Sequence, residues 1–281
     1  MIKIDSIKDI RKLLYNEKNI AFVPTMGNLH EGHLSLIDIA ISVSKTVVVS
    51  IFINPAQFTS SKDLKNYPRT PDSDIKLLSR YNNLIIFMPN IHEIYPKHSN
   101  KKYDLPIIAN ELCGKSRPEH FNGVITIIDK LFDLISPQVV IFGKKDYQQL
   151  FLVKEFAKYN YPKIEIIGGV TIRNKYGLAL SSRNNLLPEK QLINAANLYK
   201  ELQNIINQIK YSHNNNNRNI IERSTKKLDG LGWDIEYIEI RKVSDLCESS
   251  SKDSQLVVLG AGIFMGIRLI DSIEFCIDQP N

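Results

Sequence analysis

Short runs typical of buried strands alternate with helical patterns through the first two thirds of this 281-residue chain, and this alternation constrains the fold more than any other feature. The runs Ile20–Val23, Thr46–Ile53 and Leu84–Met88 are rich in β-branched and aromatic residues, and each stops at or next to a proline. Two further runs, Val139–Phe142 and Ile164–Ile167, complete the set. Strands that alternate with helices form parallel sheets with crossover helices, so the sequence predicts a doubly wound, Rossmann-like α/β sheet.

Helical patterns fill the intervals between these runs. Apolar or small residues recur at helical spacing from Gly32 to Ser44, and Val124–Ile135 follows the i, i+3, i+4, i+7 rule of an amphipathic helix. Thr70–Asp72 is typical of a helix start, because threonine is a good N-cap, proline suits the first helical position and an acid suits the first turn. We expect the doubly wound domain to span residues 1–174.

The regular alternation of strand and helix patterns ends after about Ile172. We expect a strand-like pair around Leu178–Leu180, one long helix from Pro188 to about Lys210, and a surface loop at the asparagine tract Asn214–Asn217. Three later segments have strand patterns: Asp234–Ile240, Gln255–Phe264 and Arg268–Phe275. Residues 175–281 are therefore predicted to form a smaller α+β domain.

Composition limits the class of protein. Hydrophobic residues make up 43% of the chain and charged residues 23%, as in an ordinary globular protein. No apolar run approaches the roughly 18 to 20 residues of a membrane-spanning helix, and Met1–Ser6 carries charges where a secretory peptide needs an apolar block. The cysteines are odd in number, far apart and without a C-x-x-C pair: Cys113, Cys247 and Cys276. We expect reduced thiols in a cytoplasmic protein with no membrane partner.

The net charge of +6 and the pI near 9.0 allow two interpretations. A basic RNA-binding module would need clustered cations interleaved with aromatic residues, whereas lysine and arginine are spread along this chain. An enzyme with anionic substrates is the favoured interpretation, because a positive field steers anions to their site. Tight retention of RNA that falls steeply with salt would favour the binding module instead.

The most informative segment is Pro24–Leu34, which reads PTMGNLHEGHL and joins the first buried run to the first helical pattern. The backbone N–H groups and partial positive charge of a helix's first turn favour phosphate, and Gly27 and Gly32 let a nucleotide approach the main chain. His30 and His33 supply two imidazoles that can donate to phosphoryl oxygens. The segment therefore predicts a nucleotide-binding site.

Other chemistries fit this segment less well. The spacing of Gly27 and Gly32 imitates a P-loop, but His33 stands where that loop needs lysine. A zinc protease requires H-E-x-x-H with histidines one full turn apart, whereas His30 and His33 are separated by three positions. For an isolated histidine a structural hydrogen-bonded role is the usual one. The combination of strand, glycine-flanked histidine pair and helix favours phosphate binding here.

The segment Pro24–Leu34 closely resembles the nucleotide-binding signature of the pantothenate synthetase family, which belongs to the broader group of H-x-G-H adenylyl-transferring enzymes. Four further blocks match this family in the same order: Ile53–Phe58, Tyr67–Thr70, Gly143–Gln149 and Gly177–Asn184. The resemblance therefore spans nearly the whole chain.

The resemblance implies two sets of nucleotide contacts. The main ATP-contacting stretch is Met26, Gly27, Asn28, Leu29, His30, Glu31, Gly32 and His33. The second set follows the run Val139–Phe142, where an open α/β sheet binds ligands, and consists of Gly143, Lys144, Lys145 and Asp146. His33 is implied as the proton donor, Lys145 as a point charge facing the phosphates, and Asp146 as a holder of the ribose or of the loop.

The remaining implied contacts belong to pantoate, adenine and the triphosphate. Gln57 and Gln149 match the two pantoate-binding glutamines of the family, and an amide suits a substrate with hydroxyls and a carboxylate. Ile172 matches a backbone contact to adenine. The loop of the second domain that closes over the ATP site matches Leu180, Ser181, Ser182 and Arg183.

The implied enzyme is a C–N ligase that joins pantoate and β-alanine to pantothenate, on the route to coenzyme A, through a pantoyl-adenylate. ATP is the co-substrate, AMP and pyrophosphate are released, and the implied catalytic set is His30, His33, Lys145 and Arg183 with Mg²⁺, whose protein ligands stay unassigned. A nucleotidylyltransferase of the same superfamily is the alternative, and Gln57 and Gln149 argue for the ligase. The resemblance also implies a homodimer through the first domain.

The sequence departs from the family pattern at two positions. The family often has a run of acids after Tyr67–Thr70, and here Ser73 interrupts that run. A direct magnesium contact from this segment is therefore not expected. Glu119 stands where glycine is usual. A third feature, the glycines Gly260, Gly262 and Gly266, only loosely imitates a dinucleotide fingerprint, so tight strand packing is the expected explanation.

Overall fold

The computed structural model describes residues 1–96, 102–211, 217–250 and 252–277. The chain forms two compact units, the first made of residues 1–143 and 152–170 and the second of residues 144–151 and 171–281. Residues 144–151 thus associate with the later part of the chain. The predicted domain boundary between residues 174 and 175 stays a prediction.

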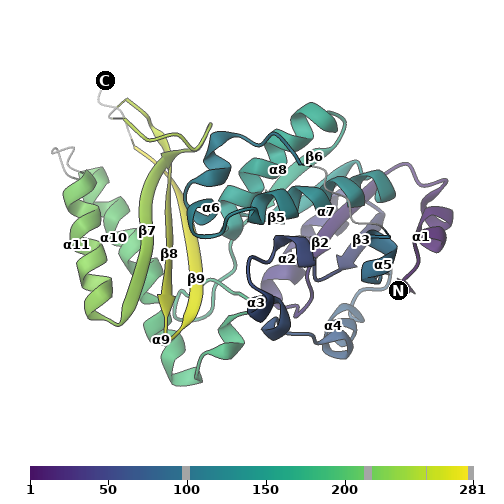
Figure 1. The fold of residues 1–281 in the computed structure, drawn as a ribbon, viewed down its shortest axis with the longest axis horizontal. Coiled ribbons are helices and arrows are strands. Elements are labelled where there is room, and N and C mark those ends of the chain that lie inside the picture. Colours follow the sequence, from purple (N-terminus) through teal and green to yellow (C-terminus); the bar gives the residue numbers. More distant parts are fainter. Residues whose placement is uncertain (97–101, 212–216, 251, 278–281) are drawn as a thin grey trace. The chain divides into compact units, whose positions relative to one another are not determined.

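A six-stranded parallel sheet forms the centre of the first unit (Figure 1). In spatial order its strands are β1 (Ile2–Ile4), β4 (Leu84–Phe87), β3 (Thr46–Ile51), β2 (Ile20–Thr25), β5 (Val139–Gly143) and β6 (Glu165–Gly169). The chain winds outward in one direction through β3 and β4 and in the other through β5 and β6, so the order reverses beside β2. This topology confirms the predicted doubly wound sheet and puts the switch point at the carboxyl ends of β2 and β5.

Helices of the first unit flank this sheet. They are α1 (Ile7–Leu14), α2 (Glu31–Val43), α3 (Ser61–Asn66), α4 (Pro71–Leu78), α5 (Ile91–Ile94), α6 (Cys113–Ser116) and α7 (His120–Ile135), with 3₁₀ helices η1 (Pro55–Gln57) and η2 (Ile107–Asn110). Helix α8 (Tyr147–Asn160) begins in the second unit and continues in the first. Leu34, Ile37 and Ala40 of α2 are buried in one cluster with Val23 and Val49 of the sheet. The predicted N-cap Thr70 and first-turn proline of α4 are confirmed.

Glu119 and the late glycines have local explanations. Glu119 is the N-cap of α7 and has φ +62°, a left-handed conformation that glycine adopts without strain. Backbone geometry therefore favours glycine at this position. Among the later glycines, Gly266 has φ +76° in the turn after β8, and a Cβ on Gly260 would lie 3.0 Å from Leu198 Cδ1. Close packing explains Gly260, as expected, whereas Gly266, with nothing within 4 Å of an added Cβ, is explained by turn geometry instead.

The second unit is built on a three-stranded antiparallel sheet with the order β7 (Trp233–Lys242), β8 (Gln255–Phe264), β9 (Ile267–Cys276). Helices α10 (Asn197–Tyr211) and α11 (Asn217–Gly230) lie against it (Figure 1). The remaining elements are η3 (Lys144–Asp146), η4 (Asn184–Leu186), η5 (Glu189–Gln191) and α9 (Leu192–Ala195). A separate core of buried apolar side chains holds the unit together, with Leu202 and Ile205 among its fully buried members.

Three predictions for this region need correction or restriction. The single helix expected from Pro188 to Lys210 is wrong: the Gln191 N–H bonds to the Pro188 carbonyl, which makes the first turn 3₁₀, and Ala196 with ψ −7° ends α9 before α10 begins. The strand pair around Leu178–Leu180 is wrong, since this segment forms only an isolated bridge between Arg173 and Ala179. The loop predicted at 214–217 lies outside the described residues except for Asn217, which starts α11.

Candidate active site

The segment after β2 is folded by its own side chains and by glycine. Thr25 Oγ1 accepts a hydrogen bond from the Gly27 N–H (3.3 Å) and donates one to the Ser50 carbonyl (2.7 Å). Gly27 and Asn28 have φ +79° and +50°, so two successive residues are left-handed. A Cβ at Gly27 would lie 3.0 Å from Asp74 Oδ2. Conformation and space therefore both require glycine here.

Asp74 fixes this segment from α4. Its side chain is buried, and its carboxylate accepts the Asn28 N–H (3.0 Å) and the Leu29 N–H (2.8 Å). Thr70 Oγ1 donates to the same carboxylate (3.2 Å). The sequence singled out Asp72 as the acid of the first turn and gave no sign that Asp74 reaches back to residues more than forty positions earlier, so the anchoring role of Asp74 was missed.

The two histidines form a reciprocal cap at the start of α2. His30 is the N-cap, and its Nδ1 accepts the Gly32 N–H (3.2 Å), while His33 Nδ1 accepts the His30 N–H (3.3 Å). Their ring centroids lie 4.1 Å apart. Since Nδ1 is the acceptor in both neutral rings, the hydrogen is on Nε2, which makes each Nε2–H a donor directed away from the helix backbone. Both residues are half-buried, outside the hydrophobic interior.

Gln57 lies beside this segment on η1. Its Oε1 accepts from Asn54 Nδ2 (3.0 Å) and its Nε2 donates to Met26 Sδ (3.0 Å). Asn54 in turn accepts from the hydroxyl of Tyr95 (2.8 Å), and burial raises the pKa of Tyr95 to about 12. The first unit thus brings Met26 and Gln57 together, and Asn54 is a connecting residue that the sequence patterns did not single out.

The predicted contacts that follow β5 are divided between the units. Gly143 ends β5 in the first unit, and Lys144, Lys145 and Asp146 form the turn η3 in the second. The Lys145 ammonium lies 3.5 Å from Asp146 Oδ2. The Lys144 ammonium is engaged by the Glu274 carboxylate at 2.5 Å. Gln149, on the first turns of α8, is half-buried.

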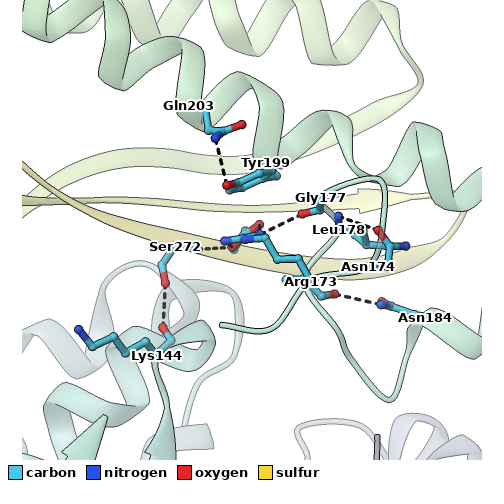
Figure 2. A network of polar contacts seen from close by, with 11 residues as sticks. Lys144, Arg173, Asn174, Gly177, Leu178, Asn184, Tyr199, Gln203 and Ser272 are labelled. Carbon is cyan, nitrogen blue, oxygen red and sulfur yellow. Dashed lines mark hydrogen bonds and ion pairs between the residues drawn. The ribbon is translucent and has the colours of Figure 1, made fainter. Parts of the chain in front are cut away.

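The predicted closing loop follows a tight hairpin of the second unit. The Leu180 N–H donates to the Ile172 carbonyl (2.9 Å), so the backbone of the predicted adenine contact supports the start of the loop. Ser181 Oγ accepts the Arg183 N–H (3.2 Å) and Ser182 is buried. The side chain of Asn184 closes the loop by donating to the Ala179 carbonyl (2.9 Å; Figure 2). The second unit therefore brings Ile172 and Leu180–Arg183 together in one compact turn.

Two structural features are absent from the described residues. Across the described ranges, no three or more histidine, cysteine, aspartate and glutamate side chains gather as they would in a protein-built metal cage. Within the same ranges no helix has both the length and the apolar content needed to cross a bilayer. Cys113, Cys247 and Cys276 are free thiols.

A doubly wound sheet with an H-x-G-H turn at the start of its first crossover helix defines the class of nucleotide-binding α/β enzymes. Comparison with known proteins gives the particular family. The sequence profile described as pantoate-beta-alanine ligase matches residues 2–274, and the chain belongs to this family. It is a ligase.

Individual relatives agree with this assignment. The pantothenate synthetase of Methylobacillus flagellatus is 44% identical over 275 residues, covering 98% of each chain. The pantothenate synthetase structure from Thermus thermophilus superposes with a TM-score of 0.91 at 32% identity, covering 97% of this chain and 99% of that one. The structure of pantoate-beta-alanine ligase from Francisella tularensis, described as complexed with beta-gamma ATP and beta-alanine, has a TM-score of 0.81 and 34% identity, with 97% of both chains covered.

Proposed function

We propose that this ligase condenses pantoate with β-alanine at the expense of ATP, through a pantoyl-adenylate. The observation that carries the proposal is the reciprocal histidine cap at the start of α2, in which both Nδ1 atoms accept backbone N–H groups and each ring keeps its hydrogen on Nε2. The Francisella tularensis relative, described with beta-gamma ATP and beta-alanine, supports the same substrates here. Membership of the pantoate-beta-alanine ligase family supplies pantoate as the acid.

The reaction needs activation because a carboxylate has no good leaving group. In the first step a pantoate carboxylate oxygen attacks the α-phosphorus of ATP, the bond from that phosphorus to the α,β-bridging oxygen breaks, and pyrophosphate leaves with that oxygen. In the second step the free amine of β-alanine attacks the carbonyl of the mixed anhydride, loses a proton, and AMP leaves with the former anhydride oxygen. One ATP is consumed for each C–N bond.

Charge builds on phosphoryl oxygens in the first step, and the proposed catalytic groups are donors suited to it. His30 and His33 offer Nε2–H groups, and His33 is the proposed proton donor. Lys145 offers a point charge from η3 and Arg183 a guanidinium from the closing loop. The backbone of Met26–His33, Gly143–Asp146, Ile172 and Leu180–Arg183 completes the proposed set of ATP contacts.

Pantoate is proposed to bind through two amides. Gln57 can donate to and accept from the hydroxyls and carboxylate of the acid, and it is held in place by Asn54. Gln149 is the second proposed amide, at the start of α8. Gln57 belongs to the first unit and Gln149 to the second, so the side chain of each is positioned by the contacts of its own unit.

We propose Mg²⁺ as the partner of the triphosphate. Both oxygens of Asp74, the buried acid nearest the H-x-G-H turn in the fold, already accept backbone N–H groups. Mg²⁺ usually keeps several waters and binds through substrate phosphates with one or two carboxylates at most. Because the Asp74 carboxylate is already engaged, the site fits an ion that ATP carries on its phosphates. The ion would neutralise charge that develops on the phosphates.

One assay tests the function. The purified protein is incubated with ATP, MgCl₂, pantoate and β-alanine, and pantothenate and AMP are quantified. We expect both products in equal amounts, with AMP release that depends on β-alanine. A nucleotidylyltransferase would keep the nucleotide on its acceptor and release no such AMP, so that outcome would overturn the proposal. Omission of Mg²⁺ with excess chelator is expected to abolish product formation.

Two further properties are proposed from the family resemblance. The protein is a homodimer through its first unit, which sedimentation velocity would test: a single species at the mass of one chain would contradict it. The protein is cytoplasmic, which accords with three free thiols. Localisation of a tagged chain in fractionated cells would test this proposal.

A further inference from the structure

Strand β9 presents three polar side chains, Asp271, Ser272 and Glu274, to two segments that are distant in the sequence. Asp271 forms a two-point ion pair with Arg173, with Nη1–Oδ2 at 2.5 Å and Nη2–Oδ1 at 2.9 Å. Ser272 Oγ donates to the Lys144 carbonyl (2.8 Å; Figure 2). The first contact reaches the hairpin before the closing loop, and the second reaches the turn η3.

Arg173 holds the hairpin at several points. Besides Asp271, its Nη1 donates to the Gly177 carbonyl (3.1 Å), and its guanidinium stacks 3.7 Å from the centroid of the Tyr199 ring on α10. Figure 2 shows Arg173 between Gly177 and the strand that carries Ser272. The tip itself is a glycine, Gly177, with φ +93°, a conformation that glycine adopts without strain. The predicted phosphate clamp, Leu180–Arg183, begins three residues beyond this fixed tip.

The turn η3 is held at both its ends by the same strand. At its first residue the Lys144 carbonyl accepts from Ser272 and the Lys144 ammonium pairs with Glu274. Directly after it, the Tyr147 hydroxyl donates to the other oxygen of Glu274 (2.7 Å). Lys145, the proposed phosphate contact, lies between these two anchors. Because Glu274 balances the charge of Lys144, we expect Lys144 to contribute to the nucleotide site through its backbone and not through its ammonium group.

The Asp271–Arg173 pair is too buried to be explained by stability alone. The side chain of Asp271 is 4% exposed and that of Arg173 is 17% exposed. Burial raises the pKa of the Asp271 carboxyl, and Arg173 opposes this effect. Removing two charges from water costs free energy that an apolar pair would not cost. The two contacts between the planar Arg173 guanidinium and the Asp271 carboxylate instead fix the orientation of Arg173.

We propose that Asp271 and Ser272 are positioning residues that hold the clamp Leu180–Arg183 and the turn Lys144–Asp146 in one fixed geometry for adenylate formation. This inference rests on the proposed function. Asp271 acts through Arg173 on the hairpin, and its Oδ1 also accepts the Ser272 N–H (2.8 Å), which joins the two arms at adjacent residues of one strand. Neither residue is assigned a contact with substrate.

Single-turnover kinetics separates positioning from folding. ATP in excess over enzyme is mixed with pantoate and Mg²⁺ without β-alanine, so that each active molecule forms one pantoyl-adenylate. The burst of pyrophosphate release gives a rate constant and an amplitude, the latter counting active molecules. For Asp271→Asn and Arg173→Lys we expect the rate constant to fall about 10- to 100-fold with the amplitude retained, because small displacements of groups at a reacting centre cost factors of this size. For Ser272→Ala we expect about fivefold, as for one hydrogen bond.

Matched variants complete the test. Ser272→Thr keeps the hydroxyl and is expected to restore the rate constant to within about twofold of wild type. Arg268→Lys alters a comparable two-point pair, between Arg268 on β9 and Glu236 on β7 (Nη2–Oε2 2.8 Å), and is expected to leave the rate constant unchanged. Ser272→Ala at the wild-type rate, or Asp271→Asn with a lowered amplitude at the wild-type rate, overturns the inference. A wild-type protein that releases no pyrophosphate with pantoate overturns the proposed function as well.

Discussion

At the scale of single residues, the candidate site depends on donors whose orientation is fixed by the backbone. The H-x-G-H turn is an example, because each histidine uses Nδ1 to satisfy an N–H group at the start of α2 and thereby keeps its hydrogen on Nε2. The structural role and the proposed phosphate-binding role of these histidines are therefore two parts of one arrangement. An imidazole that caps its own helix loses little freedom when the nucleotide arrives.

Removal of a proposed phosphate donor should lower turnover without unfolding the chain. For His33→Ala and Lys145→Ala we expect kcat to fall roughly 100- to 1000-fold, or about 3 to 4 kcal/mol in the activation free energy, as for other groups that stabilise developing charge. Steady-state assays of pantothenate formation give kcat, and circular dichroism confirms the fold. A change below about threefold in a folded variant would show that the assigned role is wrong.

Asp74 gives a sharper test of how the nucleotide segment is held. In the wild type the two carboxylate oxygens of Asp74 each accept a backbone N–H group. In Asp74→Asn one of these oxygens is replaced by an NH₂ group, which cannot accept, so one backbone N–H loses its partner. We expect a loss of about 1 to 3 kcal/mol in the free energy of unfolding and a fall of at least about tenfold in kcat/KM for ATP. Urea unfolding and steady-state kinetics measure the two effects.

Asp72→Asn is the matched control for this experiment. Asp72 lies in the same first turn of α4 but is exposed, so we expect stability within about 0.5 kcal/mol of wild type. If Asp74→Asn behaved like this control in both measurements, the anchoring role of Asp74 would have to be abandoned.

At the scale of elements, the pantoate side of the site depends on how closely α7 approaches η1. Gly123 lies on α7, and a Cβ there would be 2.0 Å from the Ala56 carbonyl oxygen and 2.6 Å from the Gln57 nitrogen. The Gly123 carbonyl also accepts from Asn54 Nδ2 (2.9 Å). The position of Gln57 is therefore set by the absence of a side chain on a neighbouring helix.

Gly123→Ala should displace η1 and with it Gln57. We expect KM for pantoate to rise at least about tenfold and the free energy of unfolding to fall by about 1 to 3 kcal/mol, as for overpacking. Gly230→Ala, also at a helical glycine but with nothing within 4 Å of the new Cβ, should leave both quantities nearly unchanged. Equal pantoate KM values for the two variants would contradict the proposed role of Gln57.

The strands that line the centre of the first unit could be predicted from sequence because their residues are apolar on both faces and end at prolines or glycines. Ile20–Val23 and Val139–Phe142 were recognised this way, and the structure extends them only to Thr25 and Gly143. Strand β1 was missed because Ile2–Ile4 is a short edge strand with two exposed residues. The contacts of Asp74 and Asp271 were also beyond the sequence, since partners far apart in the chain leave no local periodicity.

At the scale of the whole molecule, buried tyrosines in both units make the free energy of unfolding depend on pH in the alkaline range. Burial raises the pKa of Tyr95 to about 12 and also raises the pKa values of Tyr103 and Tyr161 in the first unit and Tyr147 in the second, where neighbouring carboxylates add to the effect. Above about pH 10 the unfolded chain loses these protons and the folded chain keeps them. Because the folded state then binds more protons, the free energy of unfolding must fall as pH rises from about 10 to 12.

Chemical unfolding between pH 8 and 11 tests this linkage. We expect the free energy of unfolding of the wild-type chain to be nearly independent of the tyrosines below pH 10 and to decline above it. In Tyr95→Phe the decline should be shallower, because the variant has one fewer group that releases a proton on unfolding, whereas Tyr15→Phe, at a side chain that is 85% exposed, should decline like wild type. A Tyr95→Phe curve parallel to that of Tyr15→Phe would show that the Tyr95 hydroxyl titrates alike in the folded and unfolded states, so that its burial contributes nothing to the alkaline loss of stability.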